Sequence, residues 1–590
     1  MTVIELTIGA QSMDKKGLKH LIDVSAGREK ADLCLKNCNV VDVYNRQVLT
    51  SDVYIADGII AGFGNASFIE AHETFEAGGK YLCPGFIDSH VHIESSHLSP
   101  SEFSKEIVPR GVTTVIADPH EICNVCGLDG FDYMLNATEN IALQVFLQFP
   151  SCVPCTSFEN AGASLKAADI AKRIKHERVL GLGELMDFVG VYNADDEILD
   201  KILEAKNINK IIDGHSPGLS GELLDAYAAS GVANDHECTS AEELKDKIRR
   251  GIYALVRQGT ACQDVVNLLP GIDEKNYRFC LFCTDDRQAW SIEKEGSIDN
   301  NYRLAVSEGM DPLMAICMAT INAAECFNLR DRGAVAPGKR ADLILFEDLN
   351  NLKIERVWIG GKLVAEKGLY LAKDEKIEPQ SVSGKMNVKD FSKEKLRLKL
   401  TSDKVRTIKL HPNAAVSFEG SATVKMDENS CWVRDEQDIV KIAVVERHKG
   451  TGNVGVGLLE DYGLKGGALA MTIAHDSHNI IVVGDNDSDM ELVVNKLVEV
   501  GGGMAIAKDG EILDCIVHEI AGLMTDAPGD EVATKLKSLE DLARKKLGIH
   551  DNINPFMPLC FMALPVIPEL KITDMGLFDV KEFHHVGINL

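Results

Sequence analysis

Short apolar runs rich in β-branched residues alternate with helical stretches through the middle of the chain. Typical apolar runs occupy residues 113–117, 179–183 and 281–283, and helical stretches occupy residues 241–250 and 312–324. Such alternation predicts the strands of a parallel sheet joined by helices. Because the region is long enough for eight such units, the pattern predicts an α/β fold with a (β/α)8 TIM-like barrel.

Two β-rich segments flank this region. Upstream, Asp57-Gly58 marks a turn between strand-like residues 53–55 and 59–61. Downstream, residues 341–346 and 356–363 are also strand-like. Because the two segments enclose one long insert, we expect both flanks to build a small β-sandwich together.

The last third of the chain has a different pattern. A charged stretch at residues 385–404 predicts a connector, and strand-like runs follow at 439–445 and 480–483. A helix is predicted from about 489 to 500, where three glycines end it. A chain of 590 residues is too long to fold around a single hydrophobic core. We therefore predict a β-sandwich domain from residues 1–84 and 330–385, the barrel at 85–329, and an additional C-terminal α/β domain at 386–590.

Composition narrows the classes of molecule that the protein is expected to bind and the compartment in which it works. The formal net charge of −28 disfavours nucleic-acid backbones and anionic membranes, although it does not exclude an uncharged nucleobase. No apolar run is long enough to span a bilayer, and residues 1–5 lack the features of a signal peptide. The sixteen scattered cysteines predict reduced thiols in a cytoplasmic protein. Three C-x-x-C pairs leave a structural zinc site as an alternative.

The candidate chemistry begins with His90 and His92. One residue separates them at the end of an apolar run, so both side chains point to the same face of a strand. Two imidazoles that converge in this way make half of a transition-metal site. Barrel enzymes carry their chemistry at the C-terminal ends of their strands. The other candidates at such ends are Asp118, His120, Glu121, Glu184, His215, His236 and Asp285.

Four of these imidazoles and two carboxylates fit a two-metal centre. A carboxylate can bridge two cations, and the cations lower the pKa of water, so that a hydroxide becomes nucleophilic near neutral pH. Any one of these residues alone is more often a helix cap or a loop hydrogen-bonding group. Their occurrence at successive strand ends is what predicts the metal centre.

A second polar cluster lies in the C-terminal region, where His475, Asp476 and His478 precede an apolar run. One interpretation is a strand entry held by caps and hydrogen bonds. The other is a segment that closes over the barrel mouth and supplies substrate contacts or, with Asp118, an additional metal site.

The quoted motifs resemble those of a known family. Residues 84–96 and Asp118-Pro119-His120-Glu121-Ile122 resemble the amidohydrolase superfamily, and within it the bacterial and archaeal adenine deaminases. Residues 333–345 are similar to the segment in which the chain of superfamily members leaves the barrel and re-enters the β-sandwich. Residues 474–479 are similar to a signature of adenine deaminases.

The resemblance implies a ligand set. His90, His92 and Asp285 would bind one metal, and His215 and His236 the second. Many superfamily members bridge their metals with a carboxylated lysine, whereas the corresponding strand here carries Glu184, which can bridge without modification. The resemblance implies Mn or Fe, and Zn is also possible with imidazole and carboxylate ligands.

The resemblance also implies an activity: hydrolytic deamination of adenine to hypoxanthine and ammonia by a metal-activated hydroxide, in purine salvage. Asp285 would accept the proton of the hydroxide, and His120 is the first candidate to protonate the leaving ammonia. Glu121 is a rival for that role, and Asp118 would orient a group or bind metal. We expect a homodimer or higher homo-oligomer. The alternatives are hydrolysis of another heterocycle or cyclic amide, and a non-catalytic scaffold.

Overall fold

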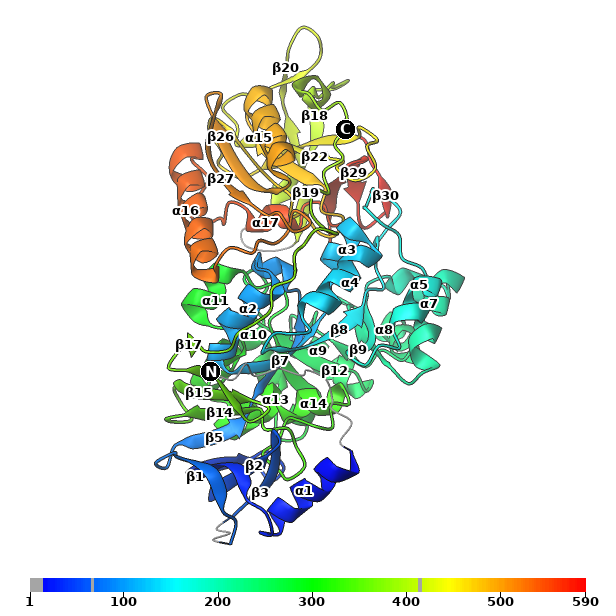
Figure 1. Cartoon of the computed structure of the whole chain (residues 1–590). Helices are drawn as coiled ribbons and strands as arrows, with labels where there is room; N and C mark the ends of the chain where they lie inside the picture. The colour runs from blue at the N-terminus through cyan, green and yellow to red at the C-terminus, as the bar shows by residue number, and fades with distance from the viewer. Residues whose placement is uncertain (1–13, 65–67, 412–415) are drawn as a thin grey trace.

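The computed structural model describes residues 14–64, 68–411 and 416–590. It arranges three large sheets one after another along an elongated molecule (Figure 1). The residues on which the prediction of no signal peptide rested lie outside the described residues.

The two flanks of the barrel pair with each other, as the sequence predicts, and they form one nine-stranded sheet. Strand β5 pairs antiparallel with β14, which brings Leu82 beside Leu345 across about 260 intervening residues. Apolar side chains of both flanks, among them Val53 and Trp358, share one core. The strands of this sheet are β1 (Ala31–Asp42), β2 (Gln47–Ala56), β3 (Ile59–Phe63), β4 (Ala71–Glu76), β5 (Tyr81–Pro84), β14 (Leu343–Phe346), β15 (Ile354–Ile359), β16 (Lys362–Glu366) and β17 (Leu369–Tyr370), and helix α1 (Lys15–Ser25) packs beside them.

The predicted barrel is confirmed. Eight parallel strands follow one another in chain order, and contacts between β13 and β6, with a bridge between Val91 and Asp285, bring the two ends of the sheet together. Because helices and loops cover both faces, the strands are buried almost throughout. They are β6 (Phe86–Val91), β7 (Val112–Ala117), β8 (Gln144–Phe149), β9 (Val179–Leu185), β10 (Ile211–Gly214), β11 (Asn234–Asp235), β12 (Tyr253–Arg257) and β13 (Cys280–Cys283).

Helices follow most of the barrel strands and complete its outer layer. They are α2 (Pro100–Ile107), α3 (His120–Cys126), α4 (Leu128–Ala137), α5 (Ala167–Arg173), α6 (Phe188–Tyr192), α7 (Asp196–Lys206), α8 (Gly221–Ala229), α9 (Ala241–Arg249), α10 (Val265–Leu268), α11 (Ala289–Glu295), α12 (Ile298–Ser307), α13 (Pro312–Ala319) and α14 (Ile321–Cys326).

The C-terminal part contains a second eight-stranded sheet, in which only β18 and β23 pair in parallel. Its strands are β18 (Lys404–Leu410), β19 (Ser417–Thr423), β22 (Ile439–Val445), β23 (Val454–Glu460), β24 (Ala468–Met471), β25 (Ile480–Gly484), β26 (Gly503–Lys508) and β27 (Glu511–Val517). Smaller sheets comprise β20 (Lys425–Met426) with β21 (Trp432–Val433), and β28 (Leu570–Thr573), β29 (Gly576–Asp579) and β30 (His584–His585).

Helix α15 (Asp487–Val500) packs on this sheet, where the sequence predicts a helix. The Asn486 side chain accepts a hydrogen bond from the backbone N–H of Asp489, which satisfies one of the free donors of the first turn. Gly501 has φ +87° and ends the helix in the left-handed conformation that glycine adopts without strain.

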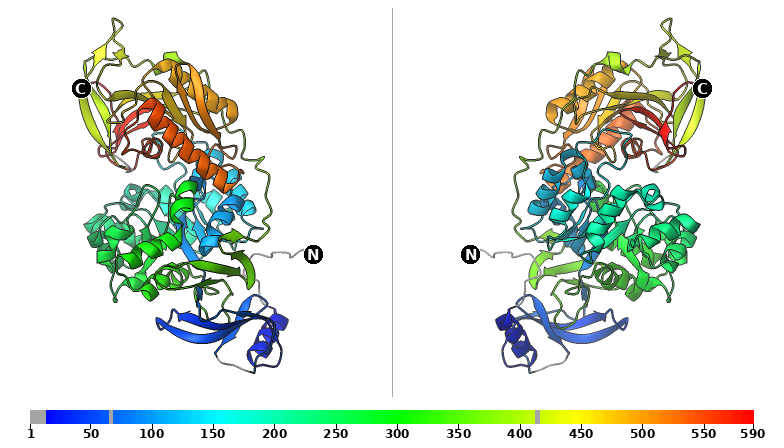
Figure 2. Two further views of the ribbon diagram at one scale, coloured as in Figure 1. Left: turned by 90° about the vertical axis from the view of Figure 1, so that its left-hand side faces the viewer. Right: turned by 90° about the vertical axis from the view of Figure 1, so that its right-hand side faces the viewer.

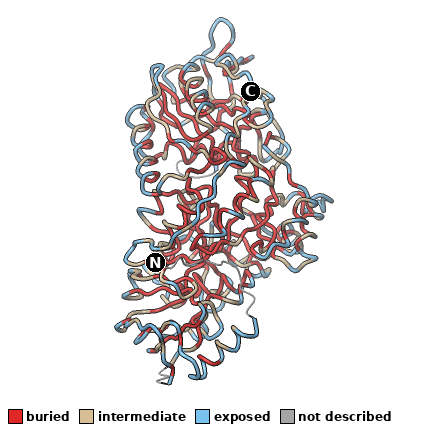
Figure 3. The backbone as a smooth tube through the Cα atoms, in the orientation of Figure 1, coloured by how far each residue is buried: buried red, intermediate tan, exposed pale blue. Residues whose placement is uncertain are grey.

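The C-terminal part lies against the barrel. Helix α16 (Gly529–Leu547) contacts α11 and α2 of the barrel, and Figure 2 shows it running down to them. Asn160 bonds with Asp574 through both its backbone and its side chain, and Leu98 forms a bridge with Thr525. Buried backbone is found in the barrel and in the sheet above it (Figure 3). The C-terminal part is therefore placed to contribute to the barrel mouth.

All sixteen cysteines are free thiols, and twelve of them are buried. The groups of potential metal ligands that the described residues form contain no cysteine. Within residues 14–64, 68–411 and 416–590, no helix has both the length and the apolar content that a membrane span requires.

Candidate metal centre

Two imidazoles converge where the first barrel strand ends. His90 lies in β6 and His92 follows that strand directly. Their Nε2 atoms are 3.1 Å apart, and both side chains are buried. Nδ1 of His92 lies 2.9 Å from the backbone oxygen of Asp118, which orients the ring. The pair presents two nitrogen atoms to one point.

Glu184 connects this pair to the other ligands. Its Oε1 lies 2.7 Å from Nε2 of His90 and 3.0 Å from Nε2 of His92. Asp285 follows β13 and places Oδ1 3.1 Å from Nε2 of His92. Ligands about 2.1 Å from one cation lie about 3.0–3.4 Å from one another in octahedral or tetrahedral geometry. These four side chains therefore have the spacing of one cation site.

Glu184 also faces a second set of ligands. Its Oε2 lies 3.2 Å from Nδ1 of His215, which follows β10, and its Oε1 lies 3.5 Å from Nε2 of His236, which follows β11. These three residues form another group that could hold a cation. A carboxylate shared by two ligand groups is the arrangement found in two-metal centres.

Several atoms of this cluster lack a hydrogen-bond partner in the described part of the chain. They are Oε1 of Glu184, both ring nitrogens of His215 and Nδ1 of His236; the close contacts between Glu184 and the imidazoles lack the geometry of hydrogen bonds. A buried polar atom without a partner costs about 1–3 kcal/mol, so the cluster is unfavourable unless something else binds it. Divalent cations, which take imidazole and ionised carboxylate ligands, fit the residues that are present.

Neighbouring charges keep the two carboxylates of the cluster ionised. Burial raises the pKa of Glu184, but the surrounding imidazoles, His236 first among them, hold it well below its usual range. Burial also raises the pKa of Asp285, but a hydrogen bond with His92 and the charges of His236 and Arg257 hold it well below its usual range. Ionised carboxylates are the form that binds a cation.

Arg257, the last residue of β12, supports Asp285 from behind. Its Nη1 donates to Oδ2 of Asp285 over 3.0 Å, and the same guanidinium contacts Glu237 and Asp264. Arg257 is not among the site residues predicted from the sequence. The apolar residues that precede it are a strand signal, and the strand-end rule applied to that strand would have included it.

His120 begins α3, just after Asp118. Its Nε2 lies 3.6 Å from Oδ1 of Asp476, and its Nδ1 lies 3.8 Å from Oδ1 of Asp118. Burial lowers the pKa of His120, but Cys152 and then the two carboxylates raise it well above its usual value. Asp118 also accepts the backbone N–H of Glu184 over 2.8 Å. The carboxylates on its two sides therefore favour the protonated form of His120.

The residues predicted as one additional site divide into two groups. Asp118 and Asp476 face His120, whereas His475 and His478 group with Glu121. Nδ1 of His478 accepts the backbone N–H of Ala474 over 3.2 Å, and its Nε2 lies 3.5 Å from Oε2 of Glu121. Neither this Nε2 nor this Oε2 has a hydrogen-bond partner in the described residues, and the spacing of Glu121, His475 and His478 could hold a cation.

Glu121 has a second contact that the sequence analysis does not identify. The hydroxyl of Ser95 lies 2.6 Å from Oε1 of Glu121 and 2.5 Å from Oδ1 of Asp286. Ser95 therefore links the buried Glu121 to a residue that lines the cavity beside the cluster.

The cavity above the ligands has walls from both parts of the chain. The C-terminal part supplies His475, Asp476, Phe561, Leu564 and Ile567, and the barrel supplies the remainder: His92, His120, Glu184, Met186, His215, His236, Glu237, Arg257, Cys262, Asp285 and Asp286. One side of the cavity is therefore polar and the other largely apolar. His90 contacts Glu184 below the cavity rather than lining it.

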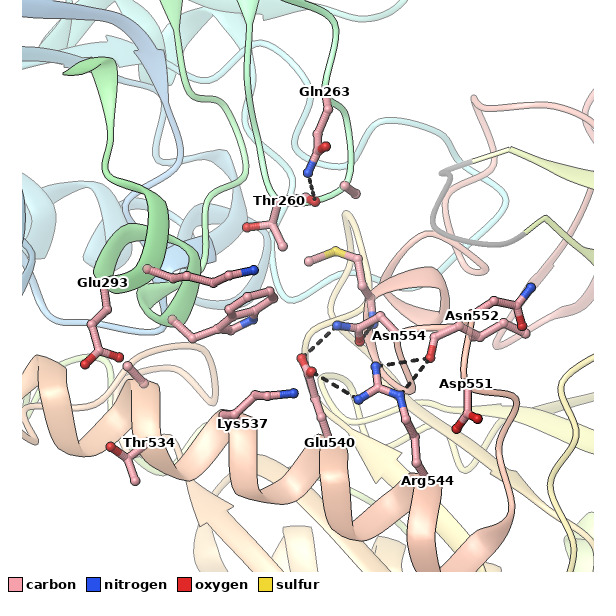
Figure 4. Close-up of a pocket in the computed structure, with 16 residues that line it drawn as sticks. Thr260, Gln263, Glu293, Thr534, Lys537, Glu540, Arg544, Asp551, Asn552 and Asn554 are labelled. Atoms are coloured by element: carbon pink, nitrogen blue, oxygen red, sulfur yellow. Dashed lines mark hydrogen bonds and ion pairs between the residues drawn. The ribbon is translucent and has the colours of Figure 1, made fainter. Parts of the chain in front are cut away.

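A larger cleft of about 800 Å³ lies next to this cavity, between the barrel and α16 (Figure 4). Thr260 and Gln263 form its barrel side, and Lys537 and Arg544 its α16 side. Cys262, from the same barrel loop, lines the cavity instead. This loop therefore separates the cleft from the cavity.

Comparisons with known proteins agree with this architecture. Residues 81–364 match the model described as "Amidohydrolase family", and residues 415–584 match "Adenine deaminase C-terminal domain". A Desulfotalea psychrophila protein named "Adenine deaminase 2" is 49% identical over 98% of this chain and 100% of its own length. A Ligilactobacillus salivarius protein named "Adenine deaminase" is 47% identical over 97% of this chain and 98% of its own. A Nitratidesulfovibrio vulgaris protein with the same name is 48% identical over 97% of this chain and 99% of its own.

Proposed function

Because the chain belongs to the amidohydrolase family and to the adenine deaminases within it, we propose that it hydrolyses adenine to hypoxanthine and ammonia. The observation that carries this proposal is the convergence on Glu184 of ligand-type side chains from separate barrel strands. They border a cavity, and their orphaned atoms fit a pair of cations. The proposed metal ligands are His90, His92, Glu184, His215, His236 and Asp285.

The proposed chemistry divides among the cations and the side chains of the chain. When bound, the cations would lower the pKa of water and so supply a nucleophile for C6 of adenine. Asp285, whose pKa is held well below its usual range, would accept the proton of that water, while Arg257 holds its carboxylate in place. Ammonia leaves only after its nitrogen is protonated, and His120 is the proposed acid because its raised pKa keeps it charged.

Other properties of the protein are proposed on weaker support. The resemblance to adenine deaminases implies Mn or Fe, and imidazole and carboxylate ligands without thiolates are compatible with these metals and with Zn. A homodimer or higher homo-oligomer, a cytoplasmic location and a role in purine salvage stay predictions.

Adenine should be deaminated by the metal-loaded protein, whereas adenosine and AMP should not react if the cavity has no room for ribose. The measurement is the ultraviolet shift to the hypoxanthine chromophore, together with ammonia release. Ammonia released from another heterocycle, or opening of a cyclic amide, with adenine inert would favour the rival amidohydrolase reaction. A protein that binds no metal and turns over none of these compounds would favour the scaffold alternative.

His120→Ala should lower the turnover number by about 10²–10³-fold, because the leaving ammonia loses its acid. Metal content should stay unchanged, since His120 is not among the proposed metal ligands, although its ring groups with Asp118 and Glu184. A matched control is His97→Ala, which removes a buried imidazole that bonds with His518 outside the cavity. Turnover that survives in His120→Ala with both metals bound would assign the proton transfer to another residue.

A further inference from the structure

The C-terminal part supplies an aromatic wall to the cavity. Phe561 follows α17 (Met557–Cys560) and lines the cavity, although only 5% of its surface is exposed. The backbone N–H of His475 donates to the oxygen of Cys560 over 2.8 Å. This bond fixes His475 beside Phe561.

The two rings are stacked. Their centroids are 4.9 Å apart and their planes differ by 15°. On its other side His475 meets His478, whose ring centroid is 5.3 Å away at 64°. His475 is therefore enclosed by rings, whereas within residues 14–64, 68–411 and 416–590 Phe561 stacks on His475 alone. Phe561 also lines the cavity, and the side of its ring that does so is called its second face.

We propose that the second face of Phe561 is the platform on which the purine ring of the substrate stacks. This inference rests on the proposed function and adds a binding residue to it. A purine is flat and uncharged, and an aromatic face binds such a ring by stacking. Leu564 and Ile567 extend the apolar wall around this platform, while the metal ligands form the polar side of the same cavity.

The position of Phe561 gives the C-terminal part a task in catalysis. The ligands belong to the barrel and the platform belongs to the C-terminal part, so a stacked base has its edge available to the ligand cluster. The backbone bond between His475 and Cys560, and the stack behind Phe561, hold the platform rigid before the base binds. Rigid placement reduces the entropy lost when the base is ordered.

The test is equilibrium binding of hypoxanthine, measured by calorimetry on the metal-loaded full-length protein. Phe561→Leu keeps an apolar side chain of similar volume but removes the aromatic face. We expect binding to weaken by about 5- to 150-fold, which is the worth of one base–aromatic stack. KM for adenine should rise by a comparable factor, with a smaller change in kcat and unchanged metal content. Phe561→Met provides a second variant without a ring in case the leucine variant does not fold.

Phe556→Leu is the matched control, because Phe556 is buried just before α17 and does not line the cavity. Its affinity for hypoxanthine should stay within threefold of the wild type. Hypoxanthine binding within threefold of the wild type in the folded Phe561 variants would overturn the platform while leaving adenine deamination intact. A wild-type protein that binds hypoxanthine through Phe561 but does not deaminate adenine would instead overturn the proposed reaction.

Discussion

Glu184→Gln should lose one or both metal ions and, with them, more than about 10³-fold of the adenine turnover. Glu184 is the residue shared by the two ligand groups, with Oε1 and Oε2 directed at different imidazoles. Glutamine has nearly the same shape but no charge, so it cannot balance two cations in a buried site. Removing one catalytic acid or base alone can cost a factor of this size. The substitution is expected to have a further effect, because loss of the metals also removes the activated water that serves as nucleophile.

Metal analysis of the purified variant, followed by assay in excess metal, measures both effects. Thermal unfolding gives an independent measurement, because a cation that binds only the folded state stabilises it by about 4 kcal/mol at a free concentration a thousand times its Kd. Chelation should lower the melting temperature of the wild type by more than that of Glu184→Gln. Two tightly bound metals per chain in the variant would contradict a bridging role.

Glu159→Gln is the matched control for this experiment. Glu159 is a buried glutamate outside the ligand groups, and burial raises its pKa to about 8, so it is neutral near pH 7. Replacing a neutral carboxyl by an amide keeps the charge of the site unchanged. Metal content and chelation sensitivity should therefore match the wild type.

The part of the site that depends on the order of the barrel strands could be predicted from the sequence. Parallel strands in a barrel bring their C-terminal ends together, so His90, Glu184 and Asp285 could be grouped from sequence although they are far apart in the chain. The same rule would have found Arg257, had its strand been included. These predictions depend on local patterns plus one topological rule.

The contribution of the C-terminal part could not be derived in this way. Phe561 lies beside His475 because a backbone bond joins His475 to Cys560 and the two rings stack, and no periodicity connects residues 475 and 561. The predicted additional site shows the same limit. Asp476 and His478 are neighbours in sequence, yet the turn between them directs one to His120 and the other to Glu121.

Asp285→Asn should lower kcat by about 10³–10⁴-fold, even in excess metal, because the ionised carboxylate both faces the ligand cluster and is the proposed proton acceptor. Asparagine keeps the shape but accepts no proton near neutral pH. The deaminase assay and metal analysis should therefore show a large loss of turnover with at most partial loss of metal.

The control for this variant distinguishes loss of the proposed base from disturbance of the ion pairs that Arg257 makes. Asp264 contacts the same guanidinium over 3.2 Å and lies outside the ligand groups. Asp264→Asn disturbs Arg257 without touching the proposed base, so its kcat should fall by no more than about 10–100-fold, well below the loss in Asp285→Asn. Equal losses in the two variants would locate the effect in the positioning of Arg257 and leave another group to accept the proton.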